Sequence, residues 1–150
     1  MPRMKRILAQ RTIMAPIDVV FERLTDHEGY VRFAGVRSAV LKKAGDVEKN
    51  GKGAVRTIET ALLSFDEEIT LFERPNRMEY FIRKSSLPVE HHGGVMEFAS
   101  RAGGTDVTWT STIEVKTPFL SGPLTTVAVL AIRRSFKQML KQVDDELSRR

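Results

Sequence analysis

An apolar stripe near the C-terminus constrains the fold more than any other feature of the sequence. Its members recur at spacings of four, four, three and four residues, which is the period of an α-helix. A helix from Pro123 to Ser148 would be about 39 Å long at 1.5 Å per residue, whereas a 150-residue domain has a radius of gyration of roughly 15 Å. Because such a helix spans the domain and is apolar on one side only, we expect it to lie across a sheet. The stripe consists of Ile132, Phe136, Leu140, Val143 and Leu147.

The middle of the chain has an apolar period of two, which predicts strands. The clearest strand is 105–116, where Trp109, Ser111 and Ile113 share a face with Val107 and Val115 and polar residues occupy the other face. This alternation is typical of a sheet with one buried and one solvated side. Further strands are expected at 36–41, 54–60, 65–72, 78–82 and around 96–98.

The N-terminal part predicts one strand followed by two short helices. Residues 4–14 are suited to a strand, and Pro16 is suited to the first turn of a helix over 17–24. Asp26 can cap a second helical segment that carries Tyr30 and Phe33. The chain is therefore expected to form a single α+β domain over residues 1–150.

Composition and charge exclude several functional classes. The absence of cysteine excludes disulfides, thiolate catalysis and cysteine-based zinc sites. The net charge of +5 is dispersed along the chain, so nucleic-acid binding is not expected. We identify no secretory signal, and the uncharged stretch 118–132 is too short to cross a bilayer. A soluble cytoplasmic protein is expected, with membrane contact that is at most peripheral.

Five segments together carry a family resemblance: APIDVVF at 15–21, LTD at 24–26, GKGAVR at 51–56, EITLFERPNRM at 68–78 and GGTDVTWT at 103–110. In this order they resemble the polyketide cyclase/dehydrase-type branch of the START-like (Bet v 1-like, SRPBCC) superfamily. The resemblance implies a helix-grip fold, in which a curved antiparallel sheet of about seven strands wraps around a long C-terminal helix. It also implies an interior cavity for a lipid, polyketide or aromatic compound. Some members of the superfamily are aromatases or cyclases and others only carry or sense a ligand, so enzyme and binding protein both stay open.

The expected strand and helix faces give a set of cavity-lining residues. Mostly apolar walls with a few convergent polar groups suit a small-molecule site. We therefore expect a binding or carrier domain, with a cyclase- or dehydrase-type enzyme as the alternative. A weaker third possibility is an interaction module in which 124–132 contacts a membrane surface or a protein. The expected lining residues are Tyr30, Phe33, Ile69, Leu71, Met78, Tyr80, Ile82, His92, Met96, Phe98, Trp109, Ser111, Ile113, Phe119, Leu124, Val127, Ala128 and Ala131.

Three polar residues are candidate catalytic groups, and one is a candidate ligand anchor. Glu67 shares its predicted face with apolar neighbours, and a carboxylate in such an apolar cavity is suited to general acid–base catalysis. The alternative is that Glu67 lies near a strand end and its carboxylate reaches water. Tyr80 and His92 are the other catalytic candidates. Arg56 either points inward and anchors an acidic ligand or lies on the surface, because its strand is too short to fix the phase.

The pair His91-His92 does not predict a metal site. Neighbouring residues on a strand project to opposite faces, so the two imidazoles do not converge on one ion. If side chains alternate regularly back from Met96 and Phe98, which are expected to point inward, His92 points inward and His91 outward. A bulge at the Gly-Gly pair 93–94 would shift this alternation. We expect neither a metal nor another cofactor.

Overall fold

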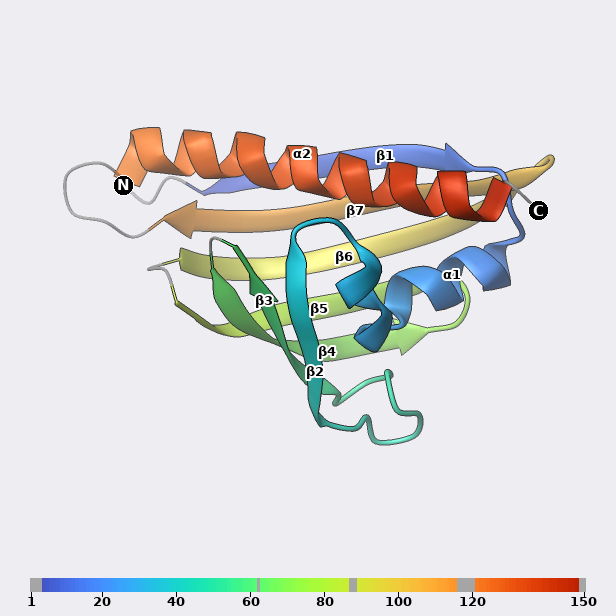
Figure 1. The fold of residues 1–150 in the computed structure, drawn as a ribbon, viewed down its shortest axis with the longest axis horizontal. Helices are drawn as coiled ribbons and strands as arrows, with labels where there is room; N and C mark the ends of the chain where they lie inside the picture. The colour runs from blue at the N-terminus through green and yellow to red at the C-terminus, as the bar shows by residue number, and fades with distance from the viewer. Residues whose placement is uncertain (1–3, 62, 87–88, 116–120, 149–150) are drawn as a thin grey trace.

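One antiparallel sheet of seven strands forms the body of the protein in the computed structural model, which describes residues 4–61, 63–86, 89–115 and 121–148 (Figure 1). The strand order across the sheet is β1-β7-β6-β5-β4-β3-β2, so β1 and β2 are the two edges. This is the helix-grip arrangement that the sequence predicted. The strands are β1 (Lys5–Ile13), β2 (Val36–Lys43), β3 (Val55–Thr60), β4 (Ser64–Glu73), β5 (Arg77–Ser85), β6 (Val89–Arg101) and β7 (Gly104–Val115).

Within the described residues, three helices complete the fold: α1 (Ile17–Thr25), the short 3₁₀ helix η1 (Glu28–Arg32) and α2 (Ser121–Ser148). The helix α2 packs chiefly on β1 and β7 and runs along them for most of its length (Figure 1). The helix α1 lies at the end of the sheet where α2 finishes, and η1 packs beside β2. No helix within the described ranges has both the length and the apolar character needed to cross a bilayer.

The main apolar core lies between α1, the C-terminal half of α2 and the inward face of the sheet. At its centre the ring of Phe21 makes edge contacts with Phe72 and Phe98, with ring centroids 5.1 and 5.0 Å apart. A second, smaller cluster beneath the first half of α2 joins Ile7, Ile113 and Val129. The predicted stripe of α2 faces the sheet, because Leu140, Val143 and Leu147 are buried and Ile132 and Phe136 are partly buried.

The strand β4 contains a bulge that reverses part of the predicted phase. Ile69 pairs with Tyr80, but Leu71 pairs with Glu79 and Phe72 with Met78, so β4 holds one residue more than β5 across this interval. Because side chains alternate along a strand, the extra residue turns Phe72 inward in place of Leu71. The expectation that Leu71 lines the interior was therefore wrong.

In the first half of α2, two side chains also point away from the interior that they were expected to line. Val127 is 64% exposed and Ala131 is exposed, whereas Val129 is buried and Ala128 partly so. At 100° per residue, Val127 and Ala131 lie on the far side of the helix from Val129 and the rest of the stripe. The prediction that they line the interior was wrong. The expected lining residue Phe119 and the side chain of Leu124 lie outside the described part of the chain.

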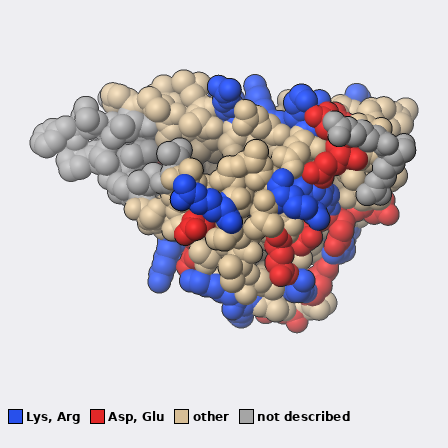
Figure 2. Space-filling model, in the orientation of Figure 1, with Lys and Arg blue, Asp and Glu red and all other residues tan. Residues whose placement is uncertain are grey.

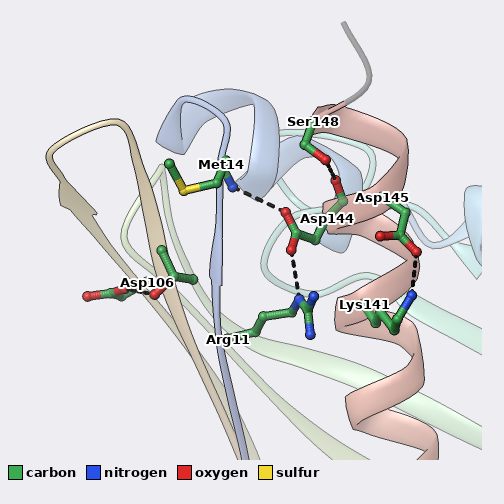
Figure 3. A network of polar contacts seen from close by, with 8 residues as sticks. Arg11, Met14, Asp106, Lys141, Asp144, Asp145 and Ser148 are labelled. Atoms are coloured by element: carbon green, nitrogen blue, oxygen red, sulfur yellow. Dashed lines mark hydrogen bonds and ion pairs between the residues drawn. The ribbon is translucent and has the colours of Figure 1, made fainter.

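Polar contacts fasten the C-terminal half of α2 to the rest of the fold (Figure 3). The carboxylate of Asp144 accepts a hydrogen bond from Arg11 Nε at 2.9 Å and one from the backbone N–H of Met14 at 3.3 Å. The guanidinium of Arg23, in α1, pairs with Glu146 at 2.9 Å. These contacts hold the end of α2 against β1 and α1.

Candidate functional site

A group of polar side chains lies on the inward face of the sheet, within the otherwise apolar interior. Its members come from five neighbouring strands, β3 to β7, and each is buried. They are Arg56, Glu67, Tyr80, His91, Trp109 and Ser111.

Arg56 and Glu67 form a buried ion pair between β3 and β4. They are direct cross-strand neighbours, and Arg56 Nε donates to Glu67 Oε2 at 2.7 Å. Their side chains are only 2% and 7% exposed, so the phase that the sequence left open for Arg56 is inward. Burial lowers the pKa of Arg56, and the neighbouring Glu67 carboxylate opposes that shift. The guanidinium also lies 5.3 Å from the centre of the Tyr30 ring.

Part of the Arg56 guanidinium is left without a partner. Its Nη1 makes no hydrogen bond with any group that the structure describes, although the atom is buried. A buried donor of this kind costs about 1–3 kcal/mol when it stays unsatisfied, and more when it is charged. An acceptor oxygen beside Nη1 would remove that cost.

Tyr80 accepts a hydrogen bond from Trp109 Nε1 at 2.8 Å. Burial raises the pKa of Tyr80 well above its ordinary value, and the nearby Glu67 carboxylate raises it further. The phenol therefore keeps its proton at neutral pH. This gives Tyr80 a hydroxyl that can donate a hydrogen bond inside the molecule.

His91, and not His92, points into the interior. The register between β6 and β7 shifts between His91 and Gly94, and Gly93 has a φ of 118°, a conformation that favours glycine. The bulge that this sequence allowed is present, and it reverses the phase that Met96 had suggested. As a result His91 is 3% exposed, while His92 lies on the outer side of the sheet, so the expectation for His92 was wrong.

The same bulge makes room for the ring of Tyr80. A Cβ atom added at Gly94 would overlap the Tyr80 ring, so only glycine allows the backbone of β6 to approach that ring so closely. The Tyr80 and His91 rings lie nearly parallel, with centroids 5.5 Å apart. The bulge thus places His91 and Tyr80 together.

Hydrogen bonds hold His91 between the backbone of Ile82 and the side chain of Ser111. The N–H of Ile82 donates to His91 Nδ1 at 3.1 Å, so in the neutral ring Nε2 carries the proton and donates to Ser111 Oγ at 2.9 Å. Ser111 also acts on Tyr80, because it lowers the pKa of that phenol against the larger, opposite effect of burial. Burial lowers the pKa of His91 to about 4, so the ring is neutral at physiological pH.

Two groups of this site can donate hydrogen bonds. Tyr80 Oη accepts from Trp109, and its hydroxyl also carries a proton that can donate. Arg56 Nη1 supplies a second donor. Two buried donors match a ligand oxygen, either a carbonyl or a carboxylate, better than they match a ligand donor.

The aromatic ring of Phe136 closes the space over Trp109. The two rings stack with centroids 3.8 Å apart and planes inclined by 8°, so α2 touches the sheet directly at this point. Phe136 belongs to the predicted stripe but was not among the expected lining residues. Its role depends on how α2 is placed over the sheet.

The expected lining residues fall into three groups. His92, Val127 and Ala131 are exposed, and Leu71, Ile82 and Ala128 are partly exposed. Of these, Ile82 still lies on the inward face, because it pairs with Glu67. The buried members are Tyr30, Phe33, Ile69, Met78, Tyr80, Met96, Phe98, Trp109, Ser111 and Ile113.

The outer side of the sheet brings Glu90, His92 and Glu114 together. Each offers one possible metal-ligand atom, and these atoms lie within 4.8 Å of one another. His91 takes no part, because it points to the opposite face. That the protein binds no metal stays a prediction.

The sequence matches the family model for polyketide cyclase / dehydrase and lipid transport proteins over residues 4–148. None of the curated proteins compared with the chain matches it.

Solved structures with the same architecture cover nearly the whole chain. A protein of Thermus thermophilus, TTHA0849, has a TM-score of 0.80 and 21% identity, over 95% of this chain and 97% of that one. The Zhui aromatase/cyclase from Streptomyces sp. R1128 has a TM-score of 0.81 and 19% identity, over 99% and 96%. A START superfamily protein from Mycobacterium smegmatis has a TM-score of 0.77 and 8% identity, over 96% and 97%. At these identities the similarity concerns the fold.

Proposed function

The chain belongs to the polyketide cyclase / dehydrase and lipid transport family, and from this premise we propose that it binds an apolar small molecule carrying a carbonyl or carboxylate oxygen. The apolar part of the ligand would lie against the inward face of the sheet. Its oxygen would accept hydrogen bonds from Arg56 and Tyr80. Few polar groups in an apolar interior are the usual composition of a small-molecule site.

The unpartnered Nη1 of Arg56 is the observation that carries this proposal. A buried ion pair is weak evidence for stability, because desolvation of the two charges offsets much of their attraction. Here Glu67 accepts from Nε of the guanidinium, and the buried Nη1 has no acceptor among the groups that the structure describes. A ligand oxygen would complete its hydrogen bonding.

Ligand entry requires α2 to move away from the sheet near its middle. The stacked rings of Trp109 and Phe136 occupy the space between the two layers. We expect the ligand to replace Phe136 as the group in contact with Trp109. The indole fluorescence of Trp109, the single tryptophan of the chain, then reports binding directly.

The proposal is tested by titrating the protein with two fluorescent acyl chains, one ending in a carboxylate and the other in a methyl group. The wild type should bind the carboxylate probe more tightly. The variant Tyr80→Phe should weaken binding of the carboxylate probe by about tenfold, the effect of losing one hydrogen bond of about 1.4 kcal/mol. Its affinity for the methyl-ended probe should not change.

A second variant tests Arg56 without leaving a lone buried charge. Removing one partner of a buried ion pair typically costs about 3–5 kcal/mol, so Arg56→Gln is combined with Glu67→Gln. This double variant should also lose the preference for the carboxylate, while the exposed substitution His92→Gln should not. If both interior variants kept the wild-type preference, the ligand would not use these donors.

Tyr80 also supports a second candidate function, a cyclase- or dehydrase-type reaction. A protonated hydroxyl held in a dry interior can polarise a substrate carbonyl as charge develops on its oxygen. The test is incubation with a short poly-β-ketone thioester and analysis of the products. Turnover by the wild type that is lost in Tyr80→Phe would establish the reaction. If the wild type left the substrate unchanged, ligand binding would be the only one of the two proposed functions still supported.

A further inference from the structure

One flank of α2 carries a stripe of basic side chains that the interior site does not use. Leu130, Arg133, Arg134, Lys137 and Lys141 share this side of the helix. Together with Gln138 and with Arg11 of β1, they line a shallow groove of about 560 Å³. We call these seven residues the basic flank. The stripe extends for about 16 Å along α2 at 1.5 Å per residue, and Figure 2 shows Lys and Arg gathered along the edge where α2 and β1 run.

Three cations of the basic flank have no carboxylate partner. Arg11 pairs with Asp144 and Lys141 with Asp145 (Figure 3), but Arg133, Arg134 and Lys137 make no ion pair within the described ranges. These three lie within four residues of one another on one helix, where like charges repel and weaken the helix. An anionic partner would relieve that repulsion.

Apolar side chains are exposed beside these cations. Val127 is 64% and Leu130 is 58% exposed, and both belong to the same part of α2 as Arg133 and Arg134. Basic residues next to exposed apolar ones on a helix are typical of segments that lie in a membrane interface. The phosphates of a nucleic acid would satisfy the cations but leave both apolar side chains in water. A bilayer surface offers anionic headgroups and an acyl boundary together.

We infer that the basic flank docks the protein on the surface of an anionic lipid bilayer. Arg133, Arg134 and Lys137 lie against the headgroups, and Val127 and Leu130 reach the acyl boundary. The inference does not depend on the proposed interior ligand, because the basic flank contains none of the residues proposed to bind that ligand.

The test is co-sedimentation of the full chain with vesicles of phosphatidylcholine, with and without phosphatidylglycerol, at low salt. The wild type should bind only the vesicles that contain phosphatidylglycerol, and added salt should weaken that binding. Each cation near an anionic surface contributes about fivefold in affinity. The triple variant Arg133→Glu, Arg134→Glu, Lys137→Glu should therefore bind at least about 100-fold more weakly.

A matched variant controls for net charge. Arg37→Glu, Lys43→Glu and Lys52→Glu change the net charge by the same amount, on the exposed side chains of β2 and the loop after it, at the opposite edge of the sheet. This control should keep the wild-type affinity. The uncharged double variant Val127→Ser, Leu130→Ser should weaken binding at every salt concentration, and circular dichroism should show that all variants fold.

Three results would overturn the inference. One is a wild type that stays in solution with phosphatidylglycerol vesicles at low salt. Another is equal loss of binding in the two triple variants, which would mean that net charge alone attracts the protein. The third is binding to duplex DNA or to an acidic polypeptide without binding to vesicles, which would assign the basic flank to a different partner.

Discussion

At the scale of single residues, burial keeps the side chains of Tyr80 and His91 neutral beside the buried ion pair of Arg56 and Glu67. It raises the pKa of Tyr80 and lowers that of His91, so neither side chain is charged at neutral pH. The backbone N–H of Ile82 fixes which His91 nitrogen carries the proton. The other nitrogen, Nε2, therefore donates to Ser111, while Tyr80 accepts from Trp109 and keeps a hydroxyl proton that can donate to a ligand.

The pKa of His91 makes stability depend on pH. Its folded pKa of about 4 lies below the ordinary value of 6.5, so between these pH values the unfolded chain binds a proton that the folded protein does not. The free energy of unfolding should therefore fall as the pH falls through this window, by about 3 kcal/mol in all. His91→Gln, which can keep both hydrogen bonds without titrating, should flatten this part of the profile.

Urea unfolding across this pH range measures the effect. Other carboxyl groups titrate near the lower limit, so the informative quantity is the difference between wild type and variant. The neighbouring change His92→Gln removes a positive charge that also lowers the pKa of His91, so it should flatten the profile slightly and much less than His91→Gln does. A His91→Gln profile as steep as that of the wild type would show that this imidazole is not held neutral.

At the scale of strands and helices, the sequence predicted long periodic elements well and short irregularities poorly. The strands and α2 were predicted because their apolar periods persist over many residues, whereas a bulge changes the facing with a single extra residue. The Gly-Gly pair after His91 is a visible signal for a bulge. The pair does not determine which of the two histidine side chains the bulge turns inward. The bulge in β4 falls at residues 70–71, Thr-Leu, which carry no such signal, and Leu71 was placed on the wrong face for that reason.

The Gly94 bulge should depend on the ring of Tyr80. Gly94→Ala introduces a Cβ where the Tyr80 ring lies, so it should destabilise the protein by about 1–3 kcal/mol, the usual effect of overpacking a core. In the background Tyr80→Ala the same substitution should cost much less, because the overlapping ring is gone. A double-mutant cycle by urea unfolding measures this coupling. Additive effects would mean that the Tyr80 ring is not what excludes a side chain at position 94.

At the scale of the whole molecule, the order of elements determined the fold, but the contents of the interior depended on the placement of α2. The sequence places Phe136 on the stripe, yet only the position of α2 over β1 and β7 brings its ring against Trp109. The sequence also does not show how firmly each half of α2 is held. In the structure, Asp144 and Glu146 bind basic residues of β1 and α1, whereas in the first half Val129 and Ile132 make apolar contacts with the sheet.

This unequal attachment predicts that the first half of α2 opens more readily than the second. Amide hydrogen exchange should be faster over 127–133 than over 140–146, although 140–146 lies closer to a helix end, where fraying would favour faster exchange. Asp144→Asn with Glu146→Gln removes the charges that fasten the second half, so exchange over 140–146 should rise while that over 127–133 changes little. Lys141→Gln, which breaks only the exposed pair with Asp145, is the matched control. Equal protection of both segments in the wild type would contradict the unequal attachment, and ligand entry would then require the whole of α2 to lift from the sheet.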